Sequence, residues 1–527
     1  MQFELNGEQV EVADDGASLL EVLRDRLGVT SVKPGCNPQG QCGCCTVLVD
    51  GEARVGCVTP ARRVAGRSVV TLEGLSDERR EAWGEALCAT GGSQCGYCTP
   101  GIVMRLEGTA GKGGDLCERA VVDRALAAHL CRCTGWQTIR EAAVMVATGA
   151  EVRSESRDFD AASRRATIEG HAHQRVGPDI GLGMGGFADD GAPSDAPVAL
   201  LAADGTWTVA PTMTEARAAI GKIQGRNTTV DAVAPIEVPD GDWALTLQTN
   251  WVEPAYLETD AAWAIPGSDP TDPLANGGAF GGKVDSPVPG DAVELAAREG
   301  GPVRLRWSRE DVVRRGPKRP PMALGMRSDG SGVVRVARTP GIVEAIVSVA
   351  PLIEVEEVDI VGPPTSTAIR GAGWAEVAAV LASLESLATD QPGTATVRSP
   401  EGASATVRID DEGAHVVVRC GEVLDTSVVR AYAIGAVHMG LGLVTSEQLS
   451  VDDQGNPLNL TIRSFGVVRP VDMIPVEVTV VDEPGIEPVS GSDAVFAATA
   501  AAIWTLQGTP GVWPTKLPVR FSDPATA

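Results

Sequence analysis

The sequence lacks the features that direct a chain to membranes or to nucleic acids. Acidic side chains number 70 against 44 basic ones among 527 residues, which gives a formal net charge of −26. Such an excess repels phosphate backbones and anionic lipid. We see no apolar run of about 18 residues, the length that a membrane helix needs, and no export signal at the N-terminus. We therefore expect a cytoplasmic protein that binds no nucleic acid and is not inserted in a membrane.

Cysteine is scarce in most of the chain. Eleven of the twelve cysteines lie between Cys36 and Cys133, and only Cys420 lies beyond. The composition is that of a globular protein, with 43% hydrophobic and 22% charged residues, and the length suits several domains. In a cytoplasmic chain, clustered cysteines are typical of metal or redox chemistry rather than of disulfides. We therefore expect the metal chemistry in the N-terminal part.

Two modules are predicted in this N-terminal part. Residues 1–75 alternate short apolar runs with hairpin signals at Asn6-Gly7 and Asp50-Gly51, which indicates a small β-rich module. Residues 76–150 carry helical apolar periodicity, and Ser76 or Asp77 can cap the first of four helices.

The rest of the chain divides into a linker and a large region. Residues 151–180 are polar and aperiodic, as expected of a linker, and we interpret His171 and His173 there as solvated side chains rather than metal ligands. Residues 181–527 mix β-branched runs, turns and Ala-rich helices, which predicts a mixed α/β region. Gly181 to Gly186 match a dinucleotide fingerprint, but no strand precedes them and no helix follows, so we expect a loop.

The first set of cysteines is Cys36, Cys42, Cys45 and Cys57. Three thiolates on one loop with a fourth further along are typical of plant-type [2Fe–2S] sites, whose usual spacing is C-x4-C-x2-C. This loop has one extra residue, which we assign to Pro38. Cys44 is a fifth thiol in the loop, and we prefer Cys42 and Cys45 because they keep the two-residue gap. A zinc site built from the same thiolates is the alternative.

The second set of cysteines is Cys95, Cys98, Cys131 and Cys133. Two of them precede one predicted helix and two follow another, so a cluster bound here would hold a helical module together. A CxxC pair is also found in dithiol redox sites, but those need a βαβ context that this segment does not supply.

The strings around these cysteines are Gln41 to Val47, Gln94 to Gly101 and Leu130 to Trp136. They resemble the iron–sulfur region of the molybdenum hydroxylases, the xanthine dehydrogenase and aldehyde oxidoreductase family, and the resemblance covers residues 1–150. It implies a β-grasp plant-type ferredoxin domain followed by a four-helix [2Fe–2S] domain. It also implies that Gln94 and Cys133 contact the pterin of a molybdenum cofactor.

Five further segments resemble this family's molybdenum domain and occur in family order. They are Tyr256–Glu258, Gly277–Lys283, Val303–Met322, Ala368–Gly373 and a C-terminal portion made of Gly435–Gly442, Asn459–Asp472 and Pro475. The resemblance implies that Gly278, Phe280, Gly281 and Arg370 bind the cofactor. The alternative is that the glycine runs only form tight turns. Residues 181–527 have about half the length that the resemblance leads us to expect. We therefore predict a shortened, mixed α/β molybdopterin-binding-like domain.

Asp493 stands where the resemblance implies a catalytic glutamate. It occurs in Gly491-Ser492-Asp493, ahead of an Ala-rich run. As a general base for hydroxylation it is one methylene short, and a misplacement of about 1 Å costs roughly 100-fold in rate. The alternative is that Ser492 or Asp493 caps the helix that follows.

Two functions remain open. The first is an enzyme that oxidises an aldehyde or N-heterocycle at a molybdenum–pterin centre and passes electrons through two [2Fe–2S] clusters. Val284 and Ala372 differ from the residues expected in purine-oxidising relatives. The second is a molybdenum-free electron-transfer or scaffold subunit. No flavin domain is recognisable, so we expect a separate flavoprotein, ferredoxin or quinone-linked acceptor, with a molybdenum subunit as a further partner.

Overall fold

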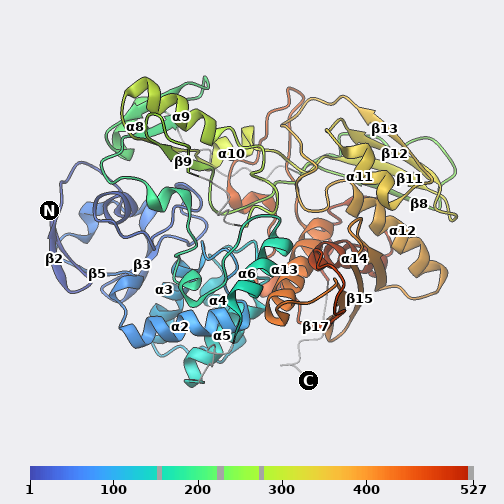
Figure 1. Cartoon of the computed structure of the whole chain (residues 1–527), viewed down its shortest axis with the longest axis horizontal. Coiled ribbons are helices and arrows are strands. Elements are labelled where there is room, and N and C mark those ends of the chain that lie inside the picture. Colours follow the sequence, from blue (N-terminus) through green and yellow to red (C-terminus); the bar gives the residue numbers. More distant parts are fainter. Residues whose placement is uncertain (151–156, 222–230, 272–277, 520–527) are drawn as a thin grey trace.

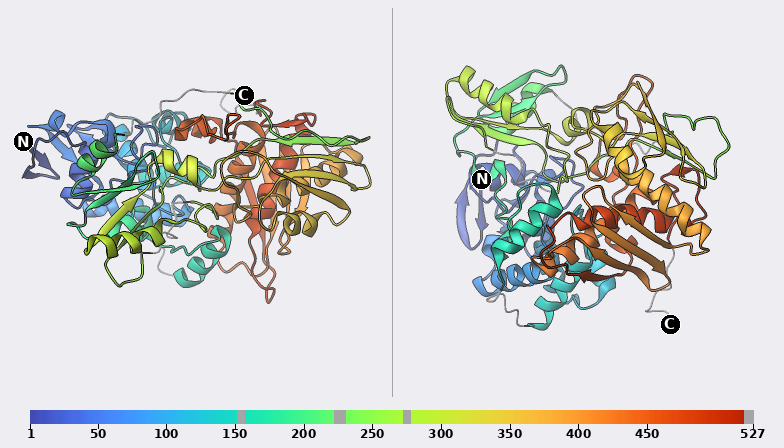
Figure 2. Two further views of the ribbon diagram at one scale, coloured as in Figure 1. Left: turned by 90° about the horizontal axis from the view of Figure 1, so that it is seen from above. Right: turned by 45° about the vertical axis from the view of Figure 1, so that its right-hand side comes forward.

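The computed structural model describes residues 1–150, 157–221, 231–271 and 278–519. The two N-terminal modules lie at one end of the molecule, on the same side as the helices Met213–Ile220 and Val288–Glu299, and the sheets that contain Met322–Met326 and Ser404–Asp410 lie at the other end (Figure 1). Figure 2 shows the same arrangement from two further directions. One hydrophobic core runs from Phe3 in the first module to Trp513 near the C-terminus, so the two halves share an interior.

The first module is a five-stranded sheet with the order β2-β1-β5-β3-β4. Asn6 and Gly7 have positive φ, as the predicted hairpin turn requires, and β1 runs parallel to β5. A short helix, α1, with a π-helical continuation follows the first hairpin. The bounds are β1 (Gln2–Leu5), β2 (Glu8–Glu11), α1 (Leu19–Glu21), β3 (Thr46–Val49), β4 (Glu52–Val55) and β5 (Ser68–Val70).

The second module is helical, as its periodicity predicts. Its helices are α2 (Asp77–Thr90), α3 (Thr99–Ala110), α4 (Arg119–Leu126) and α5 (Gln137–Thr148). The Ser76 hydroxyl accepts a hydrogen bond from the Arg79 amide at 3.2 Å, so the predicted cap of α2 is confirmed. The domain boundaries themselves stay predictions.

The expectation of an aperiodic linker over 151–180 is wrong for its described part. Residues 151–156 lie outside the described residues, but Phe159–Gly170 form helix α6 and Pro178–Gly181 form α7. Arg165 and Glu169 of α6 are fully buried. A polar segment becomes an interior helix here because these two charges, four residues apart, pair with each other. Of the loop predicted over Gly181 to Gly186, Gly181 is instead the last residue of α7, whereas residues 182–186 are confirmed as a loop.

Three sheets and the seven helices α8 to α14 occupy the described part of 190–519. The first sheet has the order β7-β6-β10-β9, and α8 and α9 pack against it. The bounds are β6 (Val198–Leu201), β7 (Trp207–Ala210), α8 (Met213–Ile220), β9 (Ala261–Ala264), α9 (Val288–Glu299), β10 (Val303–Arg306) and α10 (Arg309–Arg315).

The second sheet has the order β13-β12-β11-β8-β18, so the last described strand of the chain joins an early one. The bounds are β8 (Leu245–Thr249), β11 (Met322–Met326), β12 (Gly332–Ala337), α11 (Ile342–Val349), β13 (Ile353–Val358), α12 (Trp374–Ala388) and β18 (Val512–Trp513).

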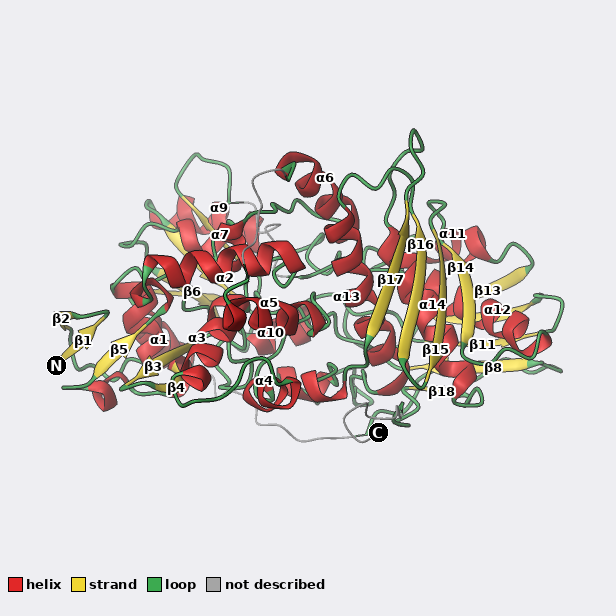
Figure 3. Cartoon of the chain, turned by 90° about the horizontal axis from the view of Figure 1, so that it is seen from below, coloured by secondary structure: helices red, strands yellow, loops and turns green. Residues whose placement is uncertain are grey.

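The third sheet has the order β14-β15-β16-β17, and α14 lies against it (Figure 3). The bounds are β14 (Thr394–Arg398), β15 (Ser404–Asp410), β16 (Gly413–Arg419), α13 (Thr426–Thr445), β17 (Val476–Val481) and α14 (Gly491–Leu506). Helix α13 is long and apolar enough to cross a membrane, which corrects the expectation of no such segment; 89% of its most apolar window is buried inside the protein. It packs chiefly against α14.

Candidate functional site

The first cysteine set converges in one buried place. The thiol of Cys36 contacts those of Cys42 and Cys57, and the thiol of Cys57 contacts that of Cys45. Backbone amides point at these sulfurs: Gln39 and Gln41 donate to Cys36 Sγ at 3.2 and 3.4 Å. Buried thiolates with N–H donors directed at them are the donor set that an iron–sulfur cluster requires.

Cys44 lies beside Cys42 and competes with it for this site. A Cβ added to Gly35 would meet Cys44 Sγ at 2.8 Å and Cys42 Sγ at 2.9 Å, so both sulfurs face Gly35. Only a glycine leaves room for them. The choice of Cys42 over Cys44 as a ligand therefore stays a prediction.

The loop of the first set is held by residues of the second half of the chain. Asn37 Nδ2 donates to the Trp307 carbonyl at 2.8 Å, and Gln39 Nε2 donates to the Leu460 carbonyl at 2.8 Å. The Arg309 guanidinium donates to the Gly35 carbonyl at 2.7 Å. The loop geometry thus depends on residues far away in the sequence.

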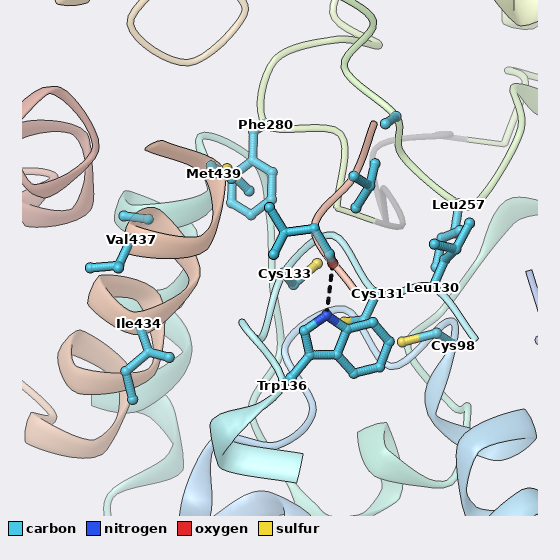
Figure 4. Packing of buried hydrophobic residues seen from close by; sticks show 14 of the residues in the cluster. Cys98, Leu130, Cys131, Cys133, Trp136, Leu257, Phe280, Ile434, Val437 and Met439 are labelled. Atoms are coloured by element: carbon cyan, nitrogen blue, oxygen red, sulfur yellow. Dashed lines mark hydrogen bonds between the residues drawn. The ribbon is translucent and has the colours of Figure 1, made fainter. Parts of the chain in front are cut away.

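The second cysteine set is also buried and close-packed. Cys133 Sγ lies 3.7 Å from Cys95 Sγ, and Cys131 Sγ lies 3.1 Å from Thr134 Oγ1. Figure 4 shows the sulfurs of Cys98, Cys131 and Cys133 near the indole ring of Trp136. The indole Nε1 donates to the Val468 carbonyl at 3.1 Å, which ties the cysteine loop to the second half.

A backbone hydrogen bond connects the two sets. The amide of Leu130, the residue before Cys131, donates to the Cys42 carbonyl at 3.0 Å. The His129 ring fills the space next to it, because a Cβ at Gly43 would lie 2.3 Å from that ring. Burial lowers the pKa of His129 to about 3, so its ring is neutral. The two sets are therefore adjacent and are joined by a direct backbone hydrogen bond.

Gln94, Cys133 and Gly278 come together, as the sequence predicts for a cofactor contact. Gln94 Nε2 donates to the carbonyls of Cys133 and Ala431 at 3.0 and 3.2 Å, while its Oε1 is buried and has no hydrogen-bond partner among the described residues. A Cβ at Gly278 would lie 2.4 Å from Cys133 Sγ. Gly277, the first residue of this glycine run, lies outside the described residues.

Phe280, Gly281 and Arg370 also meet, in direct loop-to-loop contact. The Arg370 amide donates to the Phe280 carbonyl at 3.0 Å, and the Arg370 guanidinium lies 4.1 Å from the centre of the Phe280 ring. Gly281 has a φ of 90°, and a Cβ there would lie 1.7 Å from the Ala368 carbonyl oxygen. No side chain other than hydrogen fits between these loops.

Asp493 is enclosed by two basic side chains. Its Oδ1 accepts a hydrogen bond from Arg370 Nε at 2.8 Å, and its Oδ2 lies 2.7 Å from His171 Nε2. Burial raises the pKa of Asp493, but the charges of His171 and Arg370 lower it by more, so the pKa is below its usual value. Such a carboxylate is a poor proton acceptor.

One expectation about this region needs correction, and another needs an addition. Helix α14 begins at Gly491 with Ser490 as its N-cap, so neither Ser492 nor Asp493 is the cap; Asp493 lies in the first turn. His171 is solvent-exposed, as expected, with 29% of its side chain accessible, but it also pairs with Asp493 across 322 positions of sequence.

Glu169 is a residue of this region that sequence reasoning missed. Its buried carboxylate accepts hydrogen bonds from the Gly491 and Ser492 amides at 3.2 and 2.9 Å, and it pairs with Arg165. It thus satisfies the free amides at the start of α14. The sequence offers one indication of this pair, because Arg165 and Glu169 are four residues apart and would share one face of a helix. The same spacing also occurs on exposed helices, so it does not identify a buried pair.

These contacts decide whether the residues can hold the two iron–sulfur clusters and the molybdenum–pterin cofactor that the resemblance implies. The two cysteine sets fit two [2Fe–2S] clusters, because each offers four buried thiols. The residues predicted to bind molybdenum–pterin do not fit that group in this arrangement. Asp493 is hydrogen-bonded to Arg370 and to His171. The loops at Gly281 and Ala368 are in direct contact, which leaves no space between them.

Comparison with known families assigns three domains. Residues 3–68 match the 2Fe-2S iron-sulfur cluster binding domain, and residues 71–144 match the [2Fe-2S] binding domain. Residues 391–474 match the molybdopterin cofactor-binding domain. The chain therefore carries two [2Fe–2S]-binding domains and a molybdopterin cofactor-binding domain.

Relatives match the N-terminal part. The nicotinate dehydrogenase small FeS subunit of Eubacterium barkeri is 34% identical over 144 residues, which are 27% of this chain and 90% of that subunit. The isoquinoline 1-oxidoreductase subunit alpha of Brevundimonas diminuta is 38% identical over 142 residues, 27% of this chain and 92% of the subunit. An aldehyde oxidoreductase of Megalodesulfovibrio gigas is 39% identical over 142 residues, 26% of this chain but only 16% of the relative.

The chain belongs to the molybdenum hydroxylase family of oxidoreductases, which includes aldehyde oxidoreductase and xanthine dehydrogenase. Its fold is a mixed α/β multidomain arrangement that matches the aldehyde oxidoreductase of Desulfovibrio gigas with a TM-score of 0.69 at 15% identity, covering 98% of this chain and 99% of the other. The enzyme of Desulfovibrio desulfuricans matches with a TM-score of 0.71 at 15% identity, covering 96% and 97%. At this identity the likeness shows the fold alone.

Proposed function

We propose that this chain transfers single electrons through two [2Fe–2S] clusters bound side by side in residues 1–150. The ligands of the first cluster are Cys36, Cys42, Cys45 and Cys57. The ligands of the second are Cys95, Cys98, Cys131 and Cys133. The observation that carries the proposal is the hydrogen bond from the Leu130 amide to the Cys42 carbonyl, which joins a residue next to one ligand directly to another ligand.

We infer the electron donor and the electron acceptor of this chain from its relatives. The relatives include a protein named as a small FeS subunit, which is 34% identical over 144 residues and is matched over 90% of its length. We propose that a molybdenum subunit or a similar donor supplies the electrons. A separate flavoprotein, ferredoxin or quinone-linked protein then accepts them.

Reductive titration tests the proposed function. Anaerobic titration with dithionite, followed by absorbance, should take up about two electrons per chain, one for each cluster. Re-oxidation by a ferredoxin or flavodoxin should return both. Uptake of no electrons, or reduced clusters that no acceptor protein re-oxidises, would contradict electron transfer.

A second candidate function is favoured by the match of residues 391–474 to the molybdopterin cofactor-binding domain. In it, this chain itself oxidises an aldehyde or N-heterocycle, with Asp493 as the base. Asp493 and Arg370 are already bonded to each other, which argues against it. Adding an aldehyde or an N-heterocycle to the oxidised protein without air separates the two: bleaching of the cluster absorbance supports the second function, and unchanged spectra support the first.

A further inference from the structure

Helix α6 and the residue that follows it lie where three elements of the second half meet. Arg165 and Glu169 have no exposed surface. The Glu169 carboxylate receives the Gly491 and Ser492 amides of α14, while the Arg165 guanidinium donates to the Val489 carbonyl at 2.9 Å. The end of α6 therefore fills the space at the start of α14 that a bound anion would otherwise occupy.

Arg370 has all its side-chain nitrogens engaged by the same group of residues. Its Nε donates to Asp493, and one terminal nitrogen donates to Ser492 Oγ at 2.8 Å and to the Glu169 carbonyl at 2.5 Å. The other terminal nitrogen lies 3.5 Å from Met439 Sδ. Each of the three side-chain nitrogens of Arg370 therefore already has a partner within the protein.

The two carboxylates and the two guanidiniums in this group balance in charge. Two carboxylates, Glu169 and Asp493, face the guanidiniums of Arg165 and Arg370, and His171 adds a positive charge when it is protonated. A buried group that is paired in this way needs no external ion. An anionic cofactor placed here would have to displace the Glu169 carboxylate from α14 and break the contact between Arg370 and Asp493.

We infer that residues 159–171 form an internal plug that closes the cofactor position of the family fold, so that this chain folds and works without molybdenum–pterin. The second half then serves as a scaffold that holds the two cysteine loops, through Arg309 and Trp136 among others. The plug does not depend on the proposed electron-transfer function. Only the role of the second half as a scaffold rests on that function.

The test is metal content together with hydrogen exchange. The full chain is produced in a host that makes the molybdenum–pterin cofactor, and iron, molybdenum and released pterin are measured in one sample. We expect iron and no molybdenum or pterin above background. Molybdenum in amounts equal to the chain would overturn the plug, whereas missing iron would overturn only the proposed electron transfer.

Hydrogen exchange read by mass spectrometry locates the plug in the same preparation. Peptides from 159–171 should exchange as slowly as those from α14. Glu169→Gln should raise exchange in both segments by about ten-fold or more, because it breaks the pair with Arg165 and weakens the contact with α14. The matched control, Glu299→Gln on the exposed end of α9, should leave both unchanged. Fast exchange of 159–171 in the parent protein would show that α6 is detached and would refute the inference.

Discussion

Replacement of Asp493 by asparagine removes one charge from a buried group without changing its shape. Asparagine keeps an oxygen that accepts the hydrogen bond from Arg370 Nε, which lies 2.8 Å from Asp493 Oδ1 in the parent protein. It cannot pair with the protonated ring of His171. The loss is therefore electrostatic, and it leaves the Arg370 guanidinium, whose side chain is 3% exposed, without a counter-charge.

The expected loss of stability in Asp493→Asn follows from the burial of the ion pair. Breaking a buried ion pair by removing one partner costs about 3–5 kcal/mol. Arg370 keeps the Glu169 carbonyl and Ser492 Oγ as acceptors, so we expect the lower end, about 3 kcal/mol. For a folding unit of about 150–250 residues, each kcal/mol lowers the melting temperature by roughly 2–4 °C, which predicts a loss of roughly 6–12 °C.

The control is Asp472→Asn, which breaks an exposed pair with Arg469; the two side chains are 48% and 58% exposed. Exposed pairs contribute about 0–1 kcal/mol, so this variant should melt within a few degrees of the parent. Thermal unfolding is followed by circular dichroism at one pH for all three proteins. If Asp493→Asn melts no lower than Asp472→Asn, the enclosed ion group is not present in solution.

The ion pair between His171 and Asp493 makes the stability of the protein depend on pH. Burial lowers the pKa of His171, but the charge of Asp493 raises it by more, so the folded pKa lies above the ordinary value of 6.5. The stability from His171 is complete below about pH 6.5 and is lost as the pH rises through the folded pKa. Since the pKa of Asp493 is lowered, its contribution is complete above about pH 4 and is lost as the pH falls further. The difference in melting temperature between parent and Asp493→Asn should be larger at about pH 5.5 than at about pH 9; an equal or reversed difference would contradict the pairing.

The remaining predictions concern the cysteine loops. Cys42→Ala should remove one of two paramagnetic resonance signals of the reduced protein and Cys44→Ala should keep both; the reverse result would exchange the two assignments. Cys131→Ser should remove the other signal and lower the melting temperature of the helical module, since the cluster bridges two of its helices; unchanged spectra would refute this ligand. Glu447→Gln should cost about 3–5 kcal/mol because it leaves Arg132, between two cysteine ligands, as an unpaired buried charge. The control Glu356→Gln, on an exposed pair with Arg335, should melt like the parent.

The cysteine sets could be predicted from the sequence because their chemistry is local. Three ligands of the first set lie within ten residues, and each pair of the second set is separated by two residues or fewer. Turns such as Asn6-Gly7 and caps such as Ser76 are local in the same way. Short-range features of this kind need no knowledge of the fold.

The enclosure of Asp493 could not be predicted, because its partners are remote. Arg370 lies 123 positions away and His171 lies 322 positions away. Helix α6 was misread for a related reason: a segment rich in arginine, aspartate and serine resembles an exposed linker until its charges find buried partners. The resemblance implies that Phe280, Gly281 and Arg370 bind a cofactor, and that role stays a prediction. The resemblance did not show that Arg370 is already hydrogen-bonded to Asp493.

Paramagnetic resonance of the reduced protein, with iron measured on the same sample, tests the central claim most directly. Two buried sets of four thiols predict two distinct [2Fe–2S] signals that integrate to about two spins for about four irons per chain. A single signal with about two irons, or zinc in place of iron at the first set, would contradict the account.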